Sequence, residues 1–249
     1  MKTPAVEIML RSLRLPSMLG AYRRLAEQAA AEHWGYEQYL QALAEEESEA
    51  RSKRRIERLL KRSNLPDGKN LATLKREKLP HKVGMRLPEL LGGGFTRRAE
   101  NILIFGLPGR GKTHLAAAIG HELIMEHGMP VLFTSTFALV QKLLKAKAEL
   151  KIEEMFAKLD KFEAVILDDL GYVQQSREEM EVLFTFLAER YERKSLIITS
   201  NLVFSEWDQI FKNPMTTAAA VDRLVHHSVI LEMTGKTSIR HDIHLEESG

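Results

Sequence analysis

A glycine-rich loop between an apolar run and a helical pattern constrains this chain more than any other feature. The run Asn101–Phe105 has the composition of a short buried strand, and residues 106–113, GLPGRGKT, follow it with the spacing G-x-x-x-x-G-K-[ST]. Residues 112–127 then have a helical pattern. A strand, a loop and a helix in this order predict a P-loop, in which backbone N–H groups converge at the N-terminus of a helix.

The residue types of this loop suit the phosphates of a nucleotide. Lys112 is expected to reach the β- and γ-phosphates, and the hydroxyl of Thr113 is a hard oxygen ligand for Mg²⁺. We therefore expect ATP and Mg²⁺ as cofactors. His114, next to the loop, is interpreted mainly as a packing residue. The expected phosphate-site residues are Gly106, Pro108, Gly109, Arg110, Gly111, Lys112, Thr113 and His114.

Polar residues follow two further apolar runs, at positions where strand ends of a parallel sheet line a ligand crevice. Asp168 follows AVIL and is expected to hold Mg²⁺ through water, while Asp169 would orient or deprotonate the attacking water. Asn201 follows SLIITS and would lie beside the γ-phosphate. The alternative interpretations are a solvated Asp-Asp turn and an asparagine that caps the next helix.

Five short apolar runs alternate with helical stretches from residue 101 onward: NILIF, PVLFT, AVILD, SLIIT and SVILE. This alternation predicts an α/β fold with a five-stranded parallel sheet between helices. The preceding residues instead read as helices, interrupted at Pro16 and at HWG (33–35), with a long helix from about Tyr36 to Ser63. We expect a helical domain over 1–66 for DNA binding and oligomerisation, a linker and the start of the next module over 67–100, and the nucleotide-binding domain over 101–249.

Composition excludes several classes of protein. Of the 249 residues, 44% are hydrophobic and 28% are charged, which is typical of a globular chain. Cysteine is absent, so disulfides and thiolate metal sites are excluded. The sequence contains no run of eighteen apolar residues, so we expect no membrane span. Arg11 and Arg14 argue against a secretion signal. We expect a cytoplasmic protein.

The charge is distributed unevenly between the two parts of the chain. Residues 1–85 carry 17 Lys or Arg against 11 Asp or Glu, whereas the remainder carries 19 against 23. At 100° per residue, six basic side chains between 51 and 62 fall on one face of a helix, and we call them the basic row. Such a row suits the phosphate backbone of duplex DNA without sequence preference. The alternative is a solvated face that is partly neutralised by Glu45, Glu46, Glu47 and Glu49. The basic row consists of Arg51, Arg54, Arg55, Arg58, Lys61 and Arg62.

Two arginines and two histidines near the end of the chain are further candidates. Arg223, in AAAVDRLVHHS, could reach the γ-phosphate of a neighbouring subunit as an arginine finger; the alternative is a salt bridge with Asp222 or solvation. Arg240 is a weaker candidate. His226 and His227 are adjacent, so we expect their side chains to diverge and read no metal site there.

These motifs together resemble one family, the IstB-like helper ATPases of bacterial insertion sequences, which are relatives of the DnaC and DnaI helicase loaders. The resemblance covers nearly the whole chain and rests on LRLPSMLGAYRRLAEQA, YEQYLQALAEEE, RRIERLLKRSNLP, GLPGRGKTHLA, LDDLGY, RYERKSLIITSNL, DRLVHHS and GKTSIR. It implies an AAA+ fold, in which Lys112 and Thr113 form the Walker A pair, Asp168 and Asp169 form Walker B, and Asn201 is the first sensor. Arg223 would be the arginine finger and Arg240 a second sensor.

The resemblance also implies a function. Family members assemble with ATP on DNA as ring or spiral homo-oligomers, prepare or select a target site and hand it to the transposase of the same element. Asp169 stands where most AAA+ proteins have Glu, which suggests slow hydrolysis that DNA or a partner stimulates. The chain ends soon after SIRHDIHLEESG, so we expect no separate C-terminal helical lid.

Two other functions compete with this reading. One is a replicative helicase loader, for which a neighbouring replication gene would be the sign, whereas a neighbouring transposase gene would indicate the transposition helper. The other is a stand-alone nucleotide kinase, which would have no use for the basic row or for the Asp-Arg-Leu motif.

Overall fold

The chain divides into two compact units, Met1–Arg58 and Leu59–Gly249. The computed structural model describes residues 5–171, 176–202, 206–207 and 224–233. The division between the units falls inside the long helix α3 (Tyr36–Ser63), whereas the sequence suggests a boundary at residue 66. Each unit is described here by itself, and the domain boundary stays a prediction.

The first unit is helical, as expected. It consists of α1 (Ala5–Ser12), α2 (Pro16–Ala31) and most of α3. Pro16 occupies the first turn of α2, where its missing N–H costs nothing because no acceptor lies within the helix. A small core of Ala21, Leu25 and Leu43 joins α2 to the N-terminal half of α3, with Trp34 packed against it.

Glu47 joins these helices through a buried carboxylate. Its side chain is 5% exposed and accepts hydrogen bonds from the N–H groups of Ser17 (2.7 Å) and Met18 (3.2 Å) in the first turn of α2. Arg51 Nε donates to the same carboxylate at 2.8 Å. Desolvation raises the pKa of the Glu47 carboxyl, but these hydrogen bonds outweigh it, so the pKa lies below its ordinary value. The carboxylate therefore caps α2 as an anion at the positive end of the helix.

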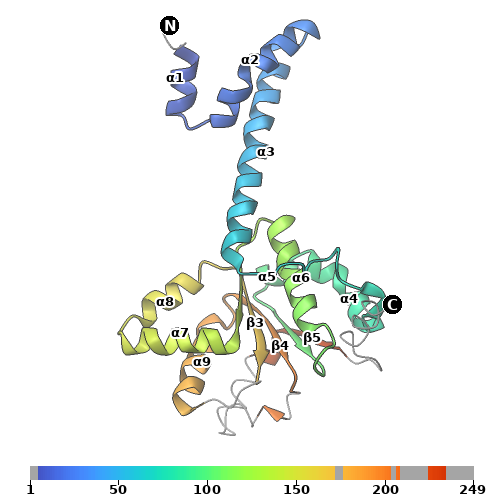
Figure 1. Cartoon of the computed structure of the whole chain (residues 1–249), viewed down its shortest axis with the longest axis vertical. Helices are drawn as coiled ribbons and strands as arrows, with labels where there is room; N and C mark the ends of the chain where they lie inside the picture. Colours follow the sequence, from blue (N-terminus) through green and yellow to red (C-terminus); the bar gives the residue numbers. More distant parts are fainter. Residues whose placement is uncertain (1–4, 172–175, 203–205, 208–223, 234–249) are drawn as a thin grey trace, which may run out of the picture. The chain divides into compact units, whose positions relative to one another are not determined.

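The second unit contains a five-stranded parallel sheet in the order β2-β3-β4-β1-β5, which confirms the expected fold class (Figure 1). All five predicted apolar runs form strands. The strands are β1 (Asn101–Phe105), β2 (Val131–Ser135), β3 (Ala164–Leu170), β4 (Ser195–Ser200) and β5 (Ser228–Glu232). Since β1 lies between β4 and β5 and the strands are parallel, the ends of β1, β3 and β4 meet at one edge of the sheet.

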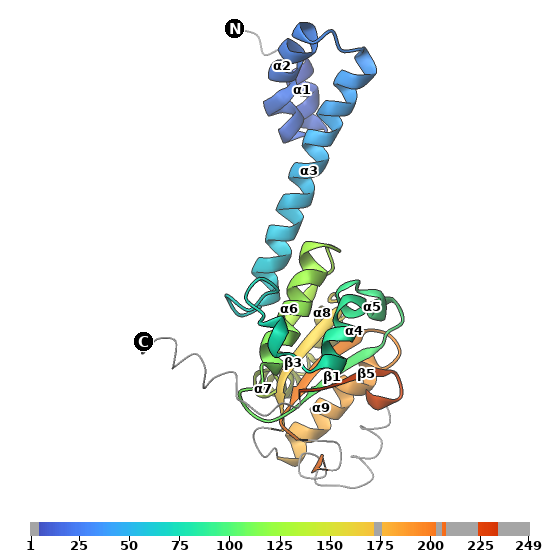
Figure 2. The same cartoon turned by 90° about the vertical axis from the view of Figure 1, so that its right-hand side faces the viewer.

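Helices cover both faces of the sheet (Figures 1 and 2). α6 contacts β1, β2, β3 and β4 on one face, whereas α7 and α9 pack on the other. Residues 67–100, expected to hold the linker, contain a 3₁₀ turn (Arg76–Lys78), α4 (His81–Leu91) and α5 (Gly94–Arg97). None of the helices in the described ranges is both long and apolar enough to cross a bilayer. The other helices are α6 (Lys112–Met125), α7 (Thr136–Ala148), α8 (Ile152–Leu159) and α9 (Arg177–Arg190).

The strands bury side chains on both faces, as expected for a covered parallel sheet. Leu103, Val165 and Ile198 face the core that α7 and α9 complete. On the opposite face α6 comes so close that a Cβ at Gly120 would lie 2.6 Å from Ile166 Cδ1. This close approach holds the helix that begins at the P-loop firmly against the sheet.

Arg190 is a buried cation that sequence reasoning missed. Its side chain is 2% exposed, and its guanidinium donates to the carbonyl oxygens of Leu159 (3.1 Å), Phe162 (3.1 Å) and Ser195 (3.2 Å). Burial lowers its pKa to about 10, so it is still a cation at neutral pH. Arg190 thus ties the end of α9 to the segments that lead into β3 and β4.

Candidate functional site

The P-loop connects β1 to α6, as the sequence predicts. Gly111 adopts φ 82° immediately before α6, a left-handed conformation that glycine adopts without strain. Gly106 has φ 151°, and a Cβ there would lie 2.8 Å from the carbonyl oxygen of Met233, which follows β5. The loop therefore requires glycine at its first position for space as well as for backbone conformation.

Lys112 and Asn201 are in direct contact, although 89 positions separate them in sequence. Lys112 is 5% exposed, and its Nζ donates to Asn201 Oδ1 at 2.5 Å and to the loop carbonyl oxygens of Gly106 (2.6 Å) and Leu107 (3.1 Å). Asn201 directly follows β4, the neighbour of β1 in the sheet. An ammonium group is thus held at the mouth of the loop by oxygens that an incoming phosphate could replace.

Asp168 and Asp169 lie at a bulge near the end of β3. The pairing of β3 with β4 shifts by one residue between Leu167 and Leu170, and Asp169 has φ 57°, which Asp tolerates better than most residues. Asp168 is 8% exposed, whereas Asp169 is exposed. The bulge therefore separates the two neighbouring carboxylates into a buried one and a solvated one.

Thr199 is a site residue whose role sequence reasoning missed. Its buried hydroxyl donates to Asp168 Oδ1 at 2.6 Å and accepts the backbone N–H of Asp169 at 2.9 Å. On the other side of Asp168, Thr136 Oγ1 donates to the Asp168 carbonyl oxygen at 3.1 Å. The threonine that ends the run SLIIT was the available signal, because a buried hydroxyl requires a partner.

His114 joins the first turn of α6 to the turn before the 3₁₀ helix. Its Nε2 lies 3.1 Å from Thr73 Oγ1 and 3.2 Å from the carbonyl oxygen of Asn70. The side chain of Asn70 closes this turn by accepting the N–H groups of Ala72 and Thr73. The ring therefore makes polar contacts within the protein, which fits the packing role expected for it.

The described residues of this edge suit a nucleotide with Mg²⁺. Asp168 supplies a carboxylate and Thr113 a hydroxyl, and both are the hard oxygen donors that Mg²⁺ prefers. Thr199 donates a hydrogen bond to one oxygen of the Asp168 carboxylate. An ionised carboxylate only accepts hydrogen bonds, so Asp168 can still serve as an oxygen ligand at the position expected for the ion. The ion, when bound, would offset the charge of the triphosphate.

Some of the expected site residues lie outside the described residues. Arg223 and Arg240 fall in the ranges 208–223 and 234–249. The stretch AAAVDRLVHHS, which contains Arg223, is described only from Leu224, and its described helical residues end at Val225. The prediction that His226 and His227 diverge is wrong: their ring centroids lie 4.5 Å apart in an edge-on arrangement. The turn that carries them lacks the regular helical spacing on which that expectation rested.

The six side chains of the basic row are exposed along α3. Several of them also have partners inside the first unit, and Arg58 Nε donates to the carbonyl oxygen of Arg54 at 3.2 Å. Arg51 donates to the carbonyl oxygen of Arg14 at 2.7 Å as well as to Glu47, and Arg54 lies 3.4 Å from Glu47. Glu47 therefore partly neutralises Arg51 and Arg54. For these two residues the structure agrees with the alternative interpretation of the basic row as a partly neutralised face.

Solved structures with similar backbones show the fold of the second unit. The chain superposes on DnaI with a TM-score of 0.57 at 20% identity, covering 69% of this chain and 96% of DnaI. The DnaC helicase loader gives 0.55 at 18%, covering 71% and 99%. DnaA bound to AMPPCP and single-stranded DNA gives 0.59 at 20%, covering 74% and 56%. The fold is that of the AAA+ P-loop proteins.

The sequence itself identifies the family. Residues 8–246 match the family described as IstB-like ATP binding protein, and the chain belongs to this family. An insertion-sequence ATP-binding protein of Sinorhizobium fredii is 48% identical, over 91% of this chain and 76% of that protein. The ATP-binding protein of insertion sequence IS21 from Pseudomonas aeruginosa is 35% identical, over 93% and 87%. The resemblance expected from the motifs is confirmed.

Proposed function

We propose that this protein is a Mg²⁺-dependent ATPase that helps an insertion sequence to transpose. It assembles with ATP as a homo-oligomeric ring or spiral on duplex DNA, prepares or selects the target site, and recruits or regulates the transposase of the same element. The observation that carries the proposal is the contact of Lys112 with Asn201 at the strand edge of a chain that belongs to the IstB-like family.

The chemistry follows from the contacts of the site. Lys112 exchanges the carbonyl oxygens of Gly106 and Leu107 for β- and γ-phosphate oxygens, which are stronger partners for an ammonium group. Asn201 remains beside Lys112 and orients the γ-phosphate or the attacking water. Asp169, exposed next to the Thr199 hydroxyl, accepts a proton from that water. Mg²⁺ held by Thr113 and Asp168 would neutralise charge that develops on the phosphates.

Hydrolysis is proposed to be slow in the isolated chain. Asp169 is one methylene shorter than the glutamate of most AAA+ proteins, so it reaches the attacking water less well. In addition, stabilisation of the developing charge depends on Arg223 from a neighbouring subunit. DNA and the transposase would stimulate hydrolysis by bringing subunits together.

The first experiment measures particle mass by light scattering after size-exclusion chromatography. The protein is run alone, with ATP, with a short duplex of arbitrary sequence, and with both. We expect large particles only with both ligands, and phosphate release that rises under the same condition. A chain that stays small, or that forms particles without nucleotide, contradicts coupled assembly.

A helicase loader has the same fold, so the partner must discriminate between the two functions. The insertion-sequence relatives support the transposition helper, whereas the likeness to DnaC and DnaI supports the fold alone. ATP hydrolysis on DNA is measured with added transposase of the element and, separately, with a replicative helicase. Stimulation by the helicase alone would reverse the assignment.

A further inference from the structure

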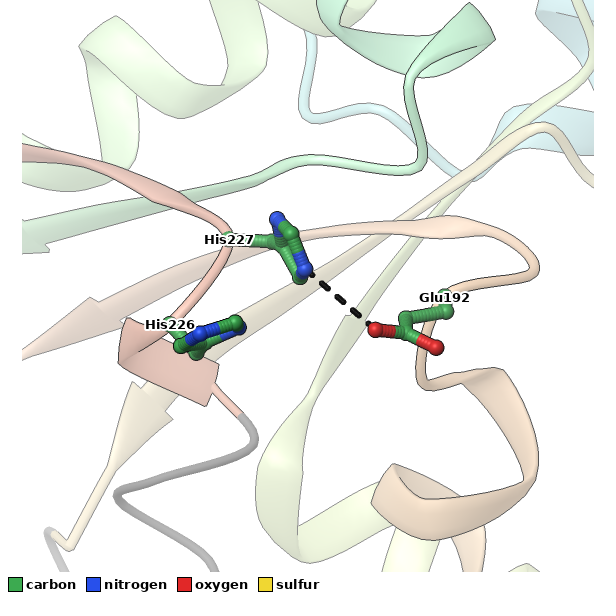
Figure 3. A group of neighbouring side chains, drawn as sticks. All are labelled: Glu192, His226 and His227. Atoms are coloured by element: carbon green, nitrogen blue, oxygen red, sulfur yellow. Dashed lines mark ion pairs between the residues drawn. The ribbon is translucent and has the colours of Figure 1, made fainter.

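Two histidines and a glutamate converge at the edge of the sheet opposite the nucleotide site. Glu192 lies in the turn before β4, and His226 and His227 lie in the turn before β5 (Figure 3). All three residues therefore lie at the N-terminal ends of these strands. Their possible ligand atoms lie within 4.8 Å of one another. His227 Nε2 is 3.3 Å from Glu192 Oε1.

The backbone holds these three residues near one another. The carbonyl oxygen of His227 accepts the N–H of Asn101 at 2.7 Å, which ties the histidine turn to the start of β1. Ser228 Oγ donates to the carbonyl oxygen of Val225 at 3.0 Å and closes the same turn. Glu192 has φ 55°, an uncommon conformation for a residue with a side chain. This backbone conformation sets the direction in which the Glu192 side chain projects.

One further carboxylate lies near the cluster, and an arginine already pairs with it. Besides Glu192, the carboxylate of Glu100 interacts electrostatically with His227, while Arg98 donates to Glu100 at 2.8 Å. The ring of Tyr191 lies 6.4 Å from that of His227 and borders the cluster on one side. The cluster therefore presents two imidazoles and one carboxylate, with a second carboxylate close by.

We propose that Glu192, His226 and His227 bind a transition-metal ion of the Zn²⁺ class. Two imidazole nitrogens with one carboxylate oxygen suit Zn²⁺, Co²⁺ or Ni²⁺ rather than the all-oxygen chemistry of Mg²⁺. Ligand atoms of a tetrahedral ion lie about 3.3 Å apart when each bond is about 2.0–2.1 Å long. Since Glu192 and His226 are exposed, their side chains can rotate to close the remaining distance.

The ion would act as a clip between two turns. It would join the turn that leads into β4, the strand that carries Thr199 and precedes Asn201, to the turn that leads into β5. A ligand that binds only the folded chain stabilises it by mass action. The site lies at the starts of strands whose other ends bear the nucleotide site, so its chemistry is separate from ATP hydrolysis.

The test uses the full chain with no histidine tag. Co²⁺ is titrated while the visible d–d absorption is followed, and Zn²⁺ is titrated by calorimetry in the presence of millimolar Mg²⁺. We expect one ion per chain, an absorption band typical of low-coordinate Co²⁺, and a higher melting temperature with Zn²⁺. Failure to bind either ion at roughly 100 µM would overturn the proposal.

Variants identify the ligands. Glu192→Gln and His226→Ala each remove one ligand from an exposed position, and each should weaken binding at least about tenfold. His81→Ala removes an exposed histidine at the start of α4 and should leave binding unchanged. Binding that survives both cluster variants, or that falls equally with His81→Ala, would show that the ion binds elsewhere and would refute the site.

Discussion

The nucleotide site and the basic row are both proposed to receive phosphate groups, yet the protein holds their side chains in different ways. At the nucleotide site, Lys112 and Asp168 are buried, and each has partners from another strand or loop. In the basic row the side chains are exposed along one helix, and the contacts of Arg51 and Arg54 lie within their own unit.

The difference matches the two kinds of phosphate recognition. Transfer of a phosphoryl group requires atoms that are fixed to within a fraction of an ångström, so buried partners position each group. A duplex backbone offers many equivalent phosphates, so mobile exposed cations suffice and their effects add. Single substitutions should therefore be severe at the nucleotide site and mild in the basic row.

The largest effect is expected for Lys112→Ala. It removes the ammonium group that contacts Asn201 and the loop carbonyl oxygens, so ATP hydrolysis should fall by roughly 10²–10³-fold. Phosphate release by the DNA-bound assembly measures it. Lys142→Ala, an exposed lysine of α7, is the matched control and should change hydrolysis less than about twofold. Equal losses in both variants would contradict the assignment of Lys112.

Thr199→Val should lower kcat about tenfold and leave KM for ATP almost unchanged. Valine has nearly the shape of threonine but lacks its hydroxyl, so the Asp169 N–H loses its hydrogen-bond acceptor. The Asp168 carboxylate loses the hydrogen bond from Thr199 and becomes free to move. Steady-state kinetics separates kcat from KM. Thr199→Ser keeps the hydroxyl and should restore most of the rate; if both variants behave alike, the hydroxyl is not what positions Asp168 and Asp169.

A smaller effect is expected when Arg55 and Arg58 are both replaced with Ala. Arg54 is left intact because it lies against Glu47. Duplex affinity should fall roughly tenfold, and the slope of log affinity against log salt should decrease by about 2. Fluorescence anisotropy at several salt concentrations measures both quantities.

The control for the basic row is the double replacement of Arg23 and Arg24 with Ala. These exposed arginines of α2 pair with Glu7 and Glu46. Their replacement removes the same amount of charge from the same unit. An equal loss of affinity in both double variants would mean that net charge, and not the row on α3, attracts DNA.

The smallest effect concerns Glu47→Gln, which tests how the first unit is held together. The folded-state pKa of Glu47 lies below the ordinary value, so its carboxylate stabilises the fold above that value. This stability is lost as the pH falls through the lowered pKa. At pH 7 the variant should lose about 1 kcal/mol, the usual contribution of a helix cap. The difference should shrink as the pH falls below the ordinary carboxyl pKa, and it should vanish once the pH is below the lowered pKa.

Hydrogen exchange of the α2 amides, corrected for intrinsic rates, compares the variant with the parent chain at pH 7 and at a series of lower pH values. Glu46→Gln is the matched control, because Glu46 is a more exposed carboxylate that pairs with Arg24 at 3.0 Å. A loss of protection in Glu47→Gln that stays constant from pH 7 down to the lowest pH at which the chain remains folded would exclude the charged form as the source of stability.

Much of the fold and part of the site could be predicted from local patterns. The five apolar runs formed the five strands, Pro16 began α2, and the long helix runs from Tyr36 to Ser63 as expected. Lys112 and Asn201 could be paired because parallel strand ends meet at one edge. The roles of Arg223 and Arg240 stay predictions, since both lie outside the described residues.

The sequence by itself determined what depends on neighbours along the chain: the P-loop, the helical and strand periods, and the family. Only the tertiary structure decided which distant polar groups share a partner. It brought Thr199 to Asp168, buried Arg190 among carbonyl oxygens, set Glu47 against α2, and turned His226 and His227 toward Glu192. The physical reason is that packing decides which polar atoms of distant segments meet, and most of those that become buried pair with whatever group lies there. That choice leaves no periodic mark in a sequence.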